Sequence, residues 1–332
     1  MTNKRAQLDA EVVALCSVRP PLGVADGVGV KRAAELLDTH MQTGGKRLRG
    51  LLPMLVVEAE GGDAVAARRF GAAVEAIHNG TLVHDDIQDR DTLRRGLPTL
   101  WTQVGVPQAI NIGDIMLIAP VAGLLADSAF PDALARGLAG ALSGALVETI
   151  RGQVADVNLR DKAGVTLEEL SAIACAKTSP LFAAALQGSC MILGKSQSQI
   201  DAAGTCGHRL GLAFQVRDDL LDALGTKGRG NAGSDLREGK PTWPLLAAAA
   251  GADEAELEPL KQLLRDAAAG TPPADEDVLK WVQWTHDRGG VDKAREALGE
   301  ALAEARELAT RAFDGGESVV ADLCDRLARL DG

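Results

Sequence analysis

Residues 83–96 read VHDDIQDRDTLRRG, placing three aspartates within five positions and following them with the pair Arg94–Arg95. On a helix, positions i and i+4 share a face, so Asp85 and Asp89 stack one turn apart, with His78 two turns earlier. The preceding residues, GTLV, are typical of a helix that faces a core. Desolvating carboxylates there is costly unless a cation lies between them. The stretch therefore predicts a buried helix that ends in a cation site.

A second stretch, FQVRDDLLD at residues 214–222, repeats the D-D-x-x-D spacing. Gln215, Asp218 and Asp222 fall on one helical face, with Asp219 beside them. A solvated acidic face is the alternative, but the apolar flanks favour a core-facing helix. Mg²⁺ suits such a site because it joins a few carboxylates to substrate phosphates. Zinc would require His or Cys, and the D-x-D-x-D-G pattern of a calcium loop is absent.

Helical patterns run nearly from end to end of the 332 residues and break where Gly and Pro cluster. Expected helices include residues 63–90, 166–194 and 197–224. The composition, 46% hydrophobic and 3% aromatic with no tyrosine, favours helices packed through small and branched side chains. We find no strand pattern of useful length, internal repeat or flexible linker. The sequence predicts one all-α domain over residues 1–332, a bundle of about 10–13 helices.

The net charge of −11 argues against nucleic acid or an anionic membrane as a general partner. The most apolar stretch, residues 110–126, is short for a membrane span and contains Asp114 and Pro120. We expect it to be a helix buried in the middle of a globular protein, not part of an integral membrane protein. Five cysteines without metal-ligand spacing indicate free thiols in a reducing cytoplasm.

Basic residues gather locally although the chain is acidic overall. Lys46 and Arg49 follow two glycines, Lys177 lies in a run of small residues, and Lys240 lies in REGKPT. Solubility explains any one of them, but together with the carboxylates they indicate phosphate binding. The spacing of a P-loop is absent, which excludes a P-loop ATPase.

GRGNAG at residues 228–233 fits G-x-G-x-x-G, the fingerprint of a dinucleotide-binding fold. No strand precedes it, so we interpret it as a loop.

Seven motifs occur in order: GGKRLR, AIHNGTLVHDDIQDRDTLRRGLPT, AINIGD, GQVAD, KTSPL, FQVRDDLLD and GSDLREGKPTWPLL. With these motifs the chain resembles the trans-isoprenyl diphosphate synthases, the polyprenyl synthetase family. The resemblance implies helices around a central cavity, and a prenyltransferase that condenses isopentenyl diphosphate with an allylic diphosphate. It also implies about three Mg²⁺ ions per active site and a homodimer.

The resemblance also implies a role for individual residues. The implied metal ligands are Asp85, Asp89, Asp218, Asp219 and Asp222, with Asp86 in support. The implied ligands of isopentenyl diphosphate are Lys46, Arg49, His78 and Arg95. Those implied for the allylic diphosphate are Arg94, Lys177, Lys240, Thr178 and Gln215. The implied catalytic group is Asp85, Asp86, Asp89, Lys177 and Asp218, with Gln153 and Asp156 in the same cavity.

Product length in the family depends on side chains just before the first aspartate motif, where aromatic residues close the product tunnel of shorter-chain members. Here these positions are Gly80 and Thr81, with Ile77 one turn deeper. The resemblance therefore implies a geranylgeranyl (C20) or longer product. The alternative is that Gly80 only permits close helix packing and that another helix sets the length.

The chain departs from the family in the loop before the last motif, which usually carries a lysine. This loop reads TKGRGNAGSD, so Lys227 or Arg229 would take the place of that lysine. One alternative function is a non-catalytic or partner-dependent subunit of a heteromeric synthase, although such subunits tend to lose motifs that this chain retains. Another is a class I terpene cyclase, against which DDLLD and the low aromatic content argue.

Overall fold

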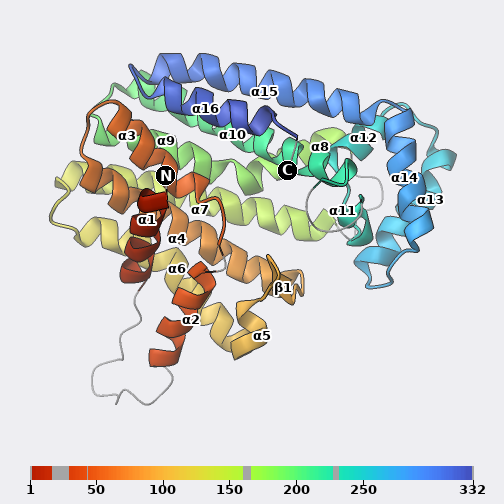
Figure 1. Ribbon diagram of the computed structural model, residues 1–332, viewed down its shortest axis with the longest axis horizontal. Helices are drawn as coiled ribbons and strands as arrows, with labels where there is room; N and C mark the ends of the chain where they lie inside the picture. Colours follow the sequence, from red (N-terminus) through yellow and green to blue (C-terminus); the bar gives the residue numbers. More distant parts are fainter. Residues whose placement is uncertain (1, 17–29, 43, 160–165, 227–231, 331–332) are drawn as a thin grey trace. The chain divides into compact units, whose positions relative to one another are not determined.

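The computed structural model describes residues 2–16, 30–42, 44–159, 166–226 and 232–330. These residues form 16 helices and one two-stranded hairpin, which confirms the prediction of an all-α fold (Figure 1). The chain divides into two compact units. Unit 1 is Met1–Leu146, Ala184–Asp201 and Phe313–Val319, and unit 2 is Val147–Ala183, Ala202–Ala312 and Val320–Gly332. The assignment of residues 1–332 to a single domain remains a prediction.

Unit 1 contains the N-terminal helices and the hairpin. Its elements are α1 (Thr2–Leu15), α2 (Val30–Gln42), α3 (Leu48–Ala59), α4 (Ala64–Gln88), β1 (Leu93–Arg94), β2 (Leu97–Pro98), α5 (Leu100–Val104) and α6 (Val106–Ala126). It also includes the first part of α7 (Asp132–Leu159), the end of α9 (Pro180–Ile192), and the first residues of α10 (Gln197–Ala223) and α16 (Glu317–Ala328).

Unit 2 contains the remaining parts of α7, α9, α10 and α16. Its other helices are α8 (Leu167–Thr178), α11 (Ser234–Arg237), α12 (Trp243–Ala249), α13 (Glu254–Ala268), α14 (Asp275–Asp287) and α15 (Gly290–Ala312). Helices α11 to α14 lie close together (Figure 1), and Leu245, Leu260 and Trp281 belong to the buried cluster between them.

Helix α4 is the core helix of unit 1 and packs against α1, α3 and α6. Asp63 caps its N-terminus, since the carboxylate accepts hydrogen bonds from the backbone N–H groups of Val65 and Ala66 at 2.8 and 3.0 Å. Phe70 and Ile77 are fully buried, and burying each stabilises the fold by about 1.5–3 kcal/mol. This packing holds α4 in place over its whole length, up to the aspartates at its end.

The hairpin follows α4 directly (Figure 1). Arg90 has a positive φ of 59°, which turns the chain away from the helix. Strands β1 and β2 pair Arg94 with Leu97. The two residues between them, Arg95 and Gly96, both have positive φ, as a type I′ turn requires. The tight turn returns the basic pair Arg94–Arg95 to the end of α4.

The number of helices exceeds the expected 10–13 for local reasons. The helix expected over residues 166–194 is divided at Ser179 into α8 and α9. Pro180 causes the break because it lacks the N–H group that would continue the helical hydrogen bonds, although Ser179 itself keeps helical φ and ψ of −80° and −27°. Helices α5 and α11 have five and four residues and are too short to show a periodic pattern. Helix α1 lies outside the helices expected from residue 30 onwards, and it buries Leu8 and Val12.

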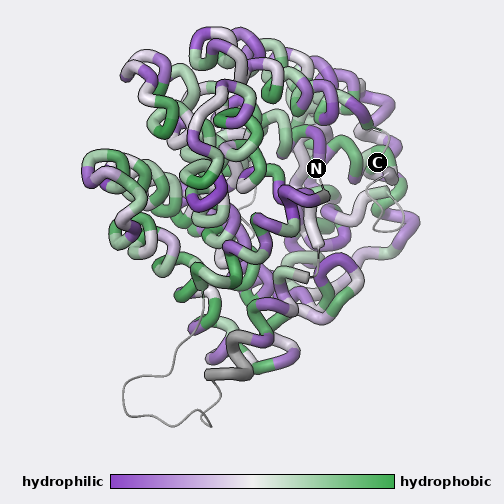
Figure 2. Tube along the Cα trace, turned by 60° about the vertical axis from the view of Figure 1, so that its left-hand side comes forward, coloured by the Kyte–Doolittle hydropathy of each residue, from purple (hydrophilic) through white to green (hydrophobic). Residues whose placement is uncertain are grey.

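Helix α6 is buried on one face only, which corrects the expectation for residues 110–126. Gly113, Met116 and Leu117 are buried, whereas Ile118 is 66% exposed and Leu125 is 55% exposed. Among the described residues, α6 and residues 132–158 of α7 are long and apolar enough to span a membrane, with 39% and 33% of their apolar windows buried. Hydrophobic and hydrophilic residues are interspersed along the helices (Figure 2).

In unit 2, α10 lies in backbone contact with the junction of α8 and α9. A Cβ atom at Gly207 would lie 2.3 Å from Ala183 Cα, and one at Gly211 would lie 2.3 Å from Ser179 Cα. Only glycine permits this approach, because real Cβ atoms do not come so close to backbone. The contact sets α8 beside α10 near the second aspartate motif.

Candidate active site

The first aspartate motif lies at the C-terminal end of α4. Asp85 and Asp86 belong to its last turn and Asp89 is its C-cap residue. Asp85 and Asp89 are half-buried, and Asp86 is 1% exposed. From the hairpin, Arg94 Nε donates a 2.7 Å hydrogen bond to Asp86 Oδ1, and Arg94 Nη2 lies 4.0 Å from Asp85 Oδ2. The structure thus brings Arg94 together with the predicted metal ligands of α4.

Asp86 Oδ2 is buried and has no hydrogen-bond partner among the described residues. Burial raises the pKa of Asp86, and the hydrogen bond from Arg94 offsets part of that rise. Buried acceptors normally have a partner, so this oxygen suits a ligand that can donate to it. A water molecule held by a cation on the neighbouring carboxylates would be such a donor, which fits the supporting role predicted for Asp86.

Within the described part of the chain, no three His, Cys, Asp or Glu side chains are close enough together to hold a metal ion by themselves. Mg²⁺ does not require such a cage, because it keeps several waters and is commonly bound through one or two carboxylates plus substrate phosphates. The oxygen-only ligands at the end of α4 fit Mg²⁺ when a diphosphate supplies the remaining ligands. Asp85 and Asp89 are the residues that would hold it, and the number of ions stays a prediction.

The GGKR segment forms a turn before α3. Gly44 and Gly45 both have positive φ, at 92° and 121°. A Cβ atom at Gly45 would lie 2.6 Å from Arg95 Nη1, so glycine makes room for that guanidinium. Arg95 Nη1 donates to the carbonyl oxygen of Gly44, and the adjacent Lys46 is exposed. Arg95 of the hairpin therefore contacts the segment that carries Lys46, and both residues are predicted to bind isopentenyl diphosphate.

The other two predicted isopentenyl diphosphate ligands contact each other. Arg49 Nη1 lies 3.2 Å from His78 Nε2. A guanidinium can only donate, so Nε2 accepts and the ring proton is on Nδ1. Desolvation lowers the pKa of His78 well below its usual value, and Arg49 and Arg94 lower it further. Burial lowers the pKa of Arg49 to about 10, which leaves it charged at neutral pH. A neutral imidazole thus lies beside a cation.

The three predicted chain-length residues lie within about one turn of α4. Gly80 faces α6, where a Cβ atom would lie 2.9 Å from both Leu117 Cδ2 and Met116 Cβ. This is the close packing that the alternative interpretation of Gly80 requires. Thr81 is half-buried and donates a 2.7 Å hydrogen bond to the carbonyl oxygen of His78, and Ile77 is fully buried. Their influence on product length stays a prediction.

The second aspartate motif lies on α10 in unit 2. Asp218 is half-buried, whereas Asp219 and Asp222 are buried. Asp219 accepts hydrogen bonds from the backbone N–H of Trp243 at 2.8 Å and from Gln215 Nε2 at 2.9 Å. Burial and the nearby charge of Asp235 raise the pKa of Asp219 to about 8. Asp218 is thus more exposed than Asp219, and metal binding by either residue stays a prediction.

Asp222 holds the chain that follows the loop after α10. Its Oδ1 accepts a 3.0 Å hydrogen bond from the backbone N–H of Ser234, and its Oδ2 accepts a 3.3 Å bond from that of Asp235. These bonds tie the start of α11 to α10. A metal-binding role of Asp222 stays a prediction. Lys227 and Arg229 lie outside the described residues, so the question of which replaces the family's loop lysine stays open.

The remaining predicted residues of unit 2 are half-buried and have polar partners. Thr178 Oγ1 lies 3.2 Å from Gln215 Oε1, which joins α8 to α10. Lys177 Nζ lies 2.9 Å from Asp156 Oδ2 of α7, and Gln153 is half-buried one turn earlier on that helix. Lys240 Nζ lies 2.9 Å from Glu238 Oε2. Each of the two ammonium groups is thus paired with a neighbouring carboxylate.

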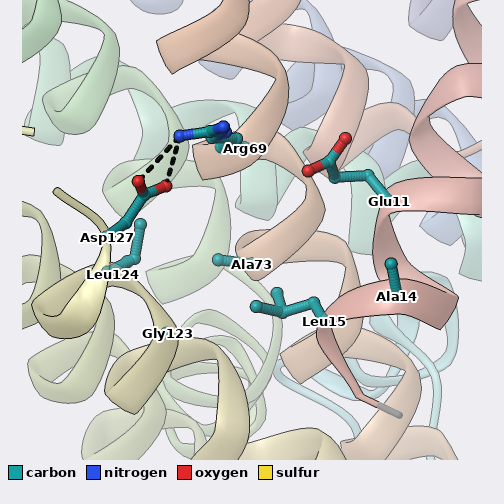
Figure 3. Close-up of a pocket in the computed structure, with 8 residues that line it drawn as sticks. All are labelled: Glu11, Ala14, Leu15, Arg69, Ala73, Gly123, Leu124 and Asp127. Carbon is teal, nitrogen blue, oxygen red and sulfur yellow. Dashed lines mark hydrogen bonds and ion pairs between the residues drawn. The ribbon is translucent and has the colours of Figure 1, made fainter. Parts of the chain in front are cut away.

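A pocket of about 270 Å³ lies elsewhere in unit 1, between α1, α4 and α6 (Figure 3). Ala73, in its wall, precedes Asp85 by twelve residues, which is about 18 Å along the helix axis. Arg69 Nη1 donates to both carboxylate oxygens of Asp127 at 2.7 and 2.6 Å. None of the predicted site residues lines this pocket, and its arginine is paired, so we assign it no part in the site.

Sequence reasoning missed a group of polar residues beneath the GGKR loop. They are Asp9, His40, Arg47, Glu75 and Asn79. The position of Arg47 between Lys46 and Arg49 was an available signal. The others are far apart in sequence, and no local pattern joins them.

Three matches to known proteins bear on the identity of the chain. It matches the family model described as "Polyprenyl synthetase" over residues 30–281. It is 34% identical over 280 residues to a geranylgeranyl pyrophosphate synthase of Geoglobus acetivorans, covering 84% of this chain and 83% of that protein. It is 35% identical over 315 residues to a geranylgeranyl diphosphate synthase of Mycobacterium tuberculosis (strain ATCC 25618 / H37Rv), covering 91% and 86%.

A solved structure agrees with these matches. The polyprenyl synthase from Caulobacter crescentus CB15, complexed with calcium and isoprenyl diphosphate, superimposes with a TM-score of 0.79 at 27% identity and covers 99% of this chain and 95% of that one. The all-α fold and the sequence matches define a trans-prenyltransferase. The chain belongs to the polyprenyl synthetase family, whose members are generally Mg²⁺-dependent and use isopentenyl diphosphate and allylic diphosphates.

Proposed function

We propose that the protein condenses isopentenyl diphosphate with an allylic diphosphate to give a linear, all-trans polyprenyl diphosphate. The observation that carries this proposal is the arrangement in unit 1, where Asp85 and Arg94 lie at the end of α4 and Arg49 lies against a neutral His78. Accessible carboxylates with fixed cations suit two diphosphate groups, one held through metal ions and one held by side chains alone.

The allylic diphosphate is proposed to bind at the aspartate motifs. Asp85 and Asp89 would hold Mg²⁺ with Asp86 in support, and Asp218 would hold a further ion with Asp219 and Asp222 behind it, about three ions in all. The side chains proposed to contact this diphosphate directly are Arg94, Lys177, Lys240, Thr178 and Gln215. The proposed ligands of isopentenyl diphosphate are Lys46, Arg49, His78 and Arg95.

The chemistry follows from these assignments. When bound, Mg²⁺ would stabilise the negative charge that develops on the leaving diphosphate. Arg94, held in place by Asp86, supplies donors aimed at the same charge before the reaction begins. The allylic C–O bond breaks, and the double bond of isopentenyl diphosphate attacks the resulting carbocation to form a C–C bond. The intermediate loses a proton to the released diphosphate, and exclusion of water protects the cation.

The residues proposed for isopentenyl diphosphate form one half-site and those proposed for the allylic diphosphate form the other. Measuring KM separately for each substrate tests this assignment. Removing the charge in Arg49→Gln should raise KM for isopentenyl diphosphate about 10- to 100-fold, the value of a hydrogen bond to a charged group. KM for the allylic diphosphate should stay within about twofold. Arg136→Gln, on an exposed side chain of α7, is the control and should change neither. Equal shifts for both substrates would contradict the assignment.

Product length is proposed to be C20 or longer. Gly80, Thr81 and Ile77 place no aromatic side chain in front of the first motif. Similar proteins from two organisms are named geranylgeranyl diphosphate synthases, which supports a product of that size.

We infer that the protein is a homodimer. The apolar residues Ile110, Ile118 and Leu125 of α6 are 41%, 66% and 55% exposed, and their spacing of seven to eight residues places them on one helix face. A second copy of the chain would cover this face and remove it from water. Sedimentation of wild type should give the dimer mass and Ile118→Asp the monomer mass. A wild-type monomer would contradict the inference.

The cytoplasm is the proposed compartment. The structure places none of the five cysteines in a disulfide, and four of them are buried. Burial raises the pKa of Cys16 to about 12, which makes that thiol unreactive. Unpaired thiols are the normal state in a reducing compartment. Labelling of intact protein with a thiol reagent should modify few cysteines, and an internal disulfide in protein isolated from cells would contradict the assignment.

A further inference from the structure

Arg47 is buried inside unit 1 although its neighbour Lys46 is exposed. Its Nε donates a 2.7 Å hydrogen bond to Asp9 Oδ1, and its Nη1 donates a 3.3 Å bond to Asn79 Oδ1 and lies 3.6 Å from Glu75 Oε1. Its Nη2 donates to a backbone carbonyl of α2. Every nitrogen of the guanidinium therefore donates a hydrogen bond to another residue of the chain, and the group joins α1, α2 and α4.

The backbone of Arg47 is unusual in a way that explains this orientation. It is the N-cap residue of α3, with φ 52° and ψ 30° in the left-handed region. A residue with a Cβ atom adopts that conformation only at a steric cost. The contacts of the guanidinium offset this cost. The left-handed turn directs Arg47 inward and lets α3 begin at Leu48, so that Arg49 lies in its first turn against His78.

Glu75 supports the same turn from α4. Its side chain is buried, and its Oε2 accepts a 3.1 Å hydrogen bond from the backbone N–H of Gly50 in the first turn of α3. Its Oε1 accepts a 3.1 Å bond from Asn79 Nδ2. A carboxylate at a helix N-terminus satisfies a free N–H group and is favoured by the helix dipole. One acidic residue thus caps α3 and helps to balance the charge of Arg47.

Helices α1, α3 and α4 meet beside Glu75 without space between them. A Cβ atom at Gly71 of α4 would lie 2.3 Å from the carbonyl oxygen of Gly50, and one at Gly50 would lie 2.8 Å from Leu8 Cδ2 of α1. Movement of α1 therefore displaces the start of α3. Since Arg49 belongs to that first turn, a change at Asp9 of α1 is transmitted to it.

We propose that Asp9, Arg47 and Glu75 are positioning residues for the isopentenyl diphosphate half of the site, and that α1 is part of this half-site. The inference rests on the proposed roles of Lys46 and Arg49. Arg47 does not contact the substrate; with its charge balanced by Asp9 and Glu75, it sets the turn that leaves Lys46 exposed and places Arg49 against His78. A misplacement of a substrate-binding side chain by about 1 Å can lower the rate by up to about 100-fold.

The test uses Asp9→Asn with Glu11→Gln as its matched control. Glu11 lies on the same helix and forms a comparable ion pair, with Arg68 Nε at 3.1 Å, but it does not contact Arg47. Asp9→Asn should raise KM for isopentenyl diphosphate about tenfold while kcat and KM for the allylic diphosphate change little. Glu11→Gln should leave all three values unchanged. Arg47→Lys keeps the charge but loses the fork geometry, and should show the same selective rise in KM.

Calorimetric titration of isopentenyl diphosphate without an allylic substrate separates this inference from the proposed function. Weaker binding to Asp9→Asn than to wild type and Glu11→Gln is the expected result. Unchanged binding and KM in Asp9→Asn and Arg47→Lys, with wild type active, would overturn the inference alone. Equal losses for both substrates would also overturn it, because they indicate general destabilisation. A wild type that binds no isopentenyl diphosphate would instead contradict the proposed function.

Discussion

Arg94 Nε donates a 2.7 Å hydrogen bond to Asp86 Oδ1, and the two residues are eight positions apart, on the hairpin and on α4. The middle residue of the first aspartate motif is therefore engaged by a side chain that we assign to the allylic diphosphate. This contact separates the three aspartates by role. Asp85 and Asp89 present half-buried carboxylates, whereas Asp86 is buried and holds Arg94.

The separation of roles predicts unequal effects of two matched substitutions. Asp85→Asn should lower kcat by about 100-fold or more, because it removes a proposed metal ligand at the leaving group. Asp86→Asn should lower it by about tenfold, because it keeps an acceptor for Arg94 but loses the charge. Steady-state kinetics at saturating Mg²⁺ measure kcat of both variants. The control is Asp132→Asn, at a highly exposed aspartate, which should leave kcat unchanged. Equal losses at the two positions would show that both aspartates bind metal directly.

Stability should fall in acid because His40 is buried in a neutral form. Burial lowers its pKa from 6.5 to about 4, and Arg94 and Arg47 add to this effect. Between these values the unfolded chain binds the proton and the folded chain does not. The free energy of unfolding therefore decreases as pH falls, by about 2–3 kcal/mol between pH 7.5 and 4.5. Urea unfolding at both pH values measures this free energy. Between pH 7.5 and 4.5 it should decrease less for His40→Gln than for wild type. Equal decreases in the two proteins would show that His40 is not the cause.

Thr81 offers the most direct change of product length. It is half-buried on α4 one turn before Asp85, and a phenylalanine there would occupy the space proposed for the growing chain. Thr81→Phe should shorten the main product by at least one five-carbon unit, while Thr81→Ser, which keeps the hydroxyl, should leave it unchanged. Chromatography of the dephosphorylated prenols measures the length. The same product from Thr81→Phe and wild type would exclude Thr81 from the tunnel wall.

Gly80 should respond to substitution through stability. A Cβ atom there would lie 2.9 Å from Leu117 Cδ2 and 3.1 Å from the carbonyl oxygen of Gly113. Gly80→Ala should destabilise the fold by about 1–3 kcal/mol through overpacking. At Gly140 of α7, a Cβ atom meets nothing within 4 Å, so Gly140→Ala is a matched control and should stabilise by about 0.5–1 kcal/mol. An altered product from Gly80→Ala without lost stability would favour a chain-length role.

The sequence was most informative where function depends on local spacing. The i, i+4 arithmetic placed Asp85 and Asp89 at a helix end and Asp218 with Asp222 on α10, and the structure confirms both helices. The basic run around Lys46 was also recognisable. The helix break at Ser179 was missed although Pro180 signals it, because the residues on both sides continue the helical pattern.

Long-range contacts account for what could not be predicted. Arg47 contacts Asp9 and Asn79, which are 38 and 32 positions away. No periodicity relates such residues, and only the packing of α1, α3 and α4 brings them together. The hydrogen bonds of Asp219 to Trp243 and of Asp222 to Ser234 likewise depend on how the chain returns after α10. Spacing along one helix indicates its shared face but not which element covers it.

The central claim is Mg²⁺-dependent condensation by the chain alone, and a product assay tests it most directly. Purified protein would receive isopentenyl diphosphate with C5, C10 or C15 allylic diphosphates, in Mg²⁺ or in EDTA, and the dephosphorylated products would be sized. We predict linear prenols of C20 or longer that form with Mg²⁺ and disappear in EDTA. Cyclic hydrocarbon with free diphosphate would instead indicate a terpene cyclase. The absence of turnover with every primer would contradict the account and indicate a subunit that depends on a partner.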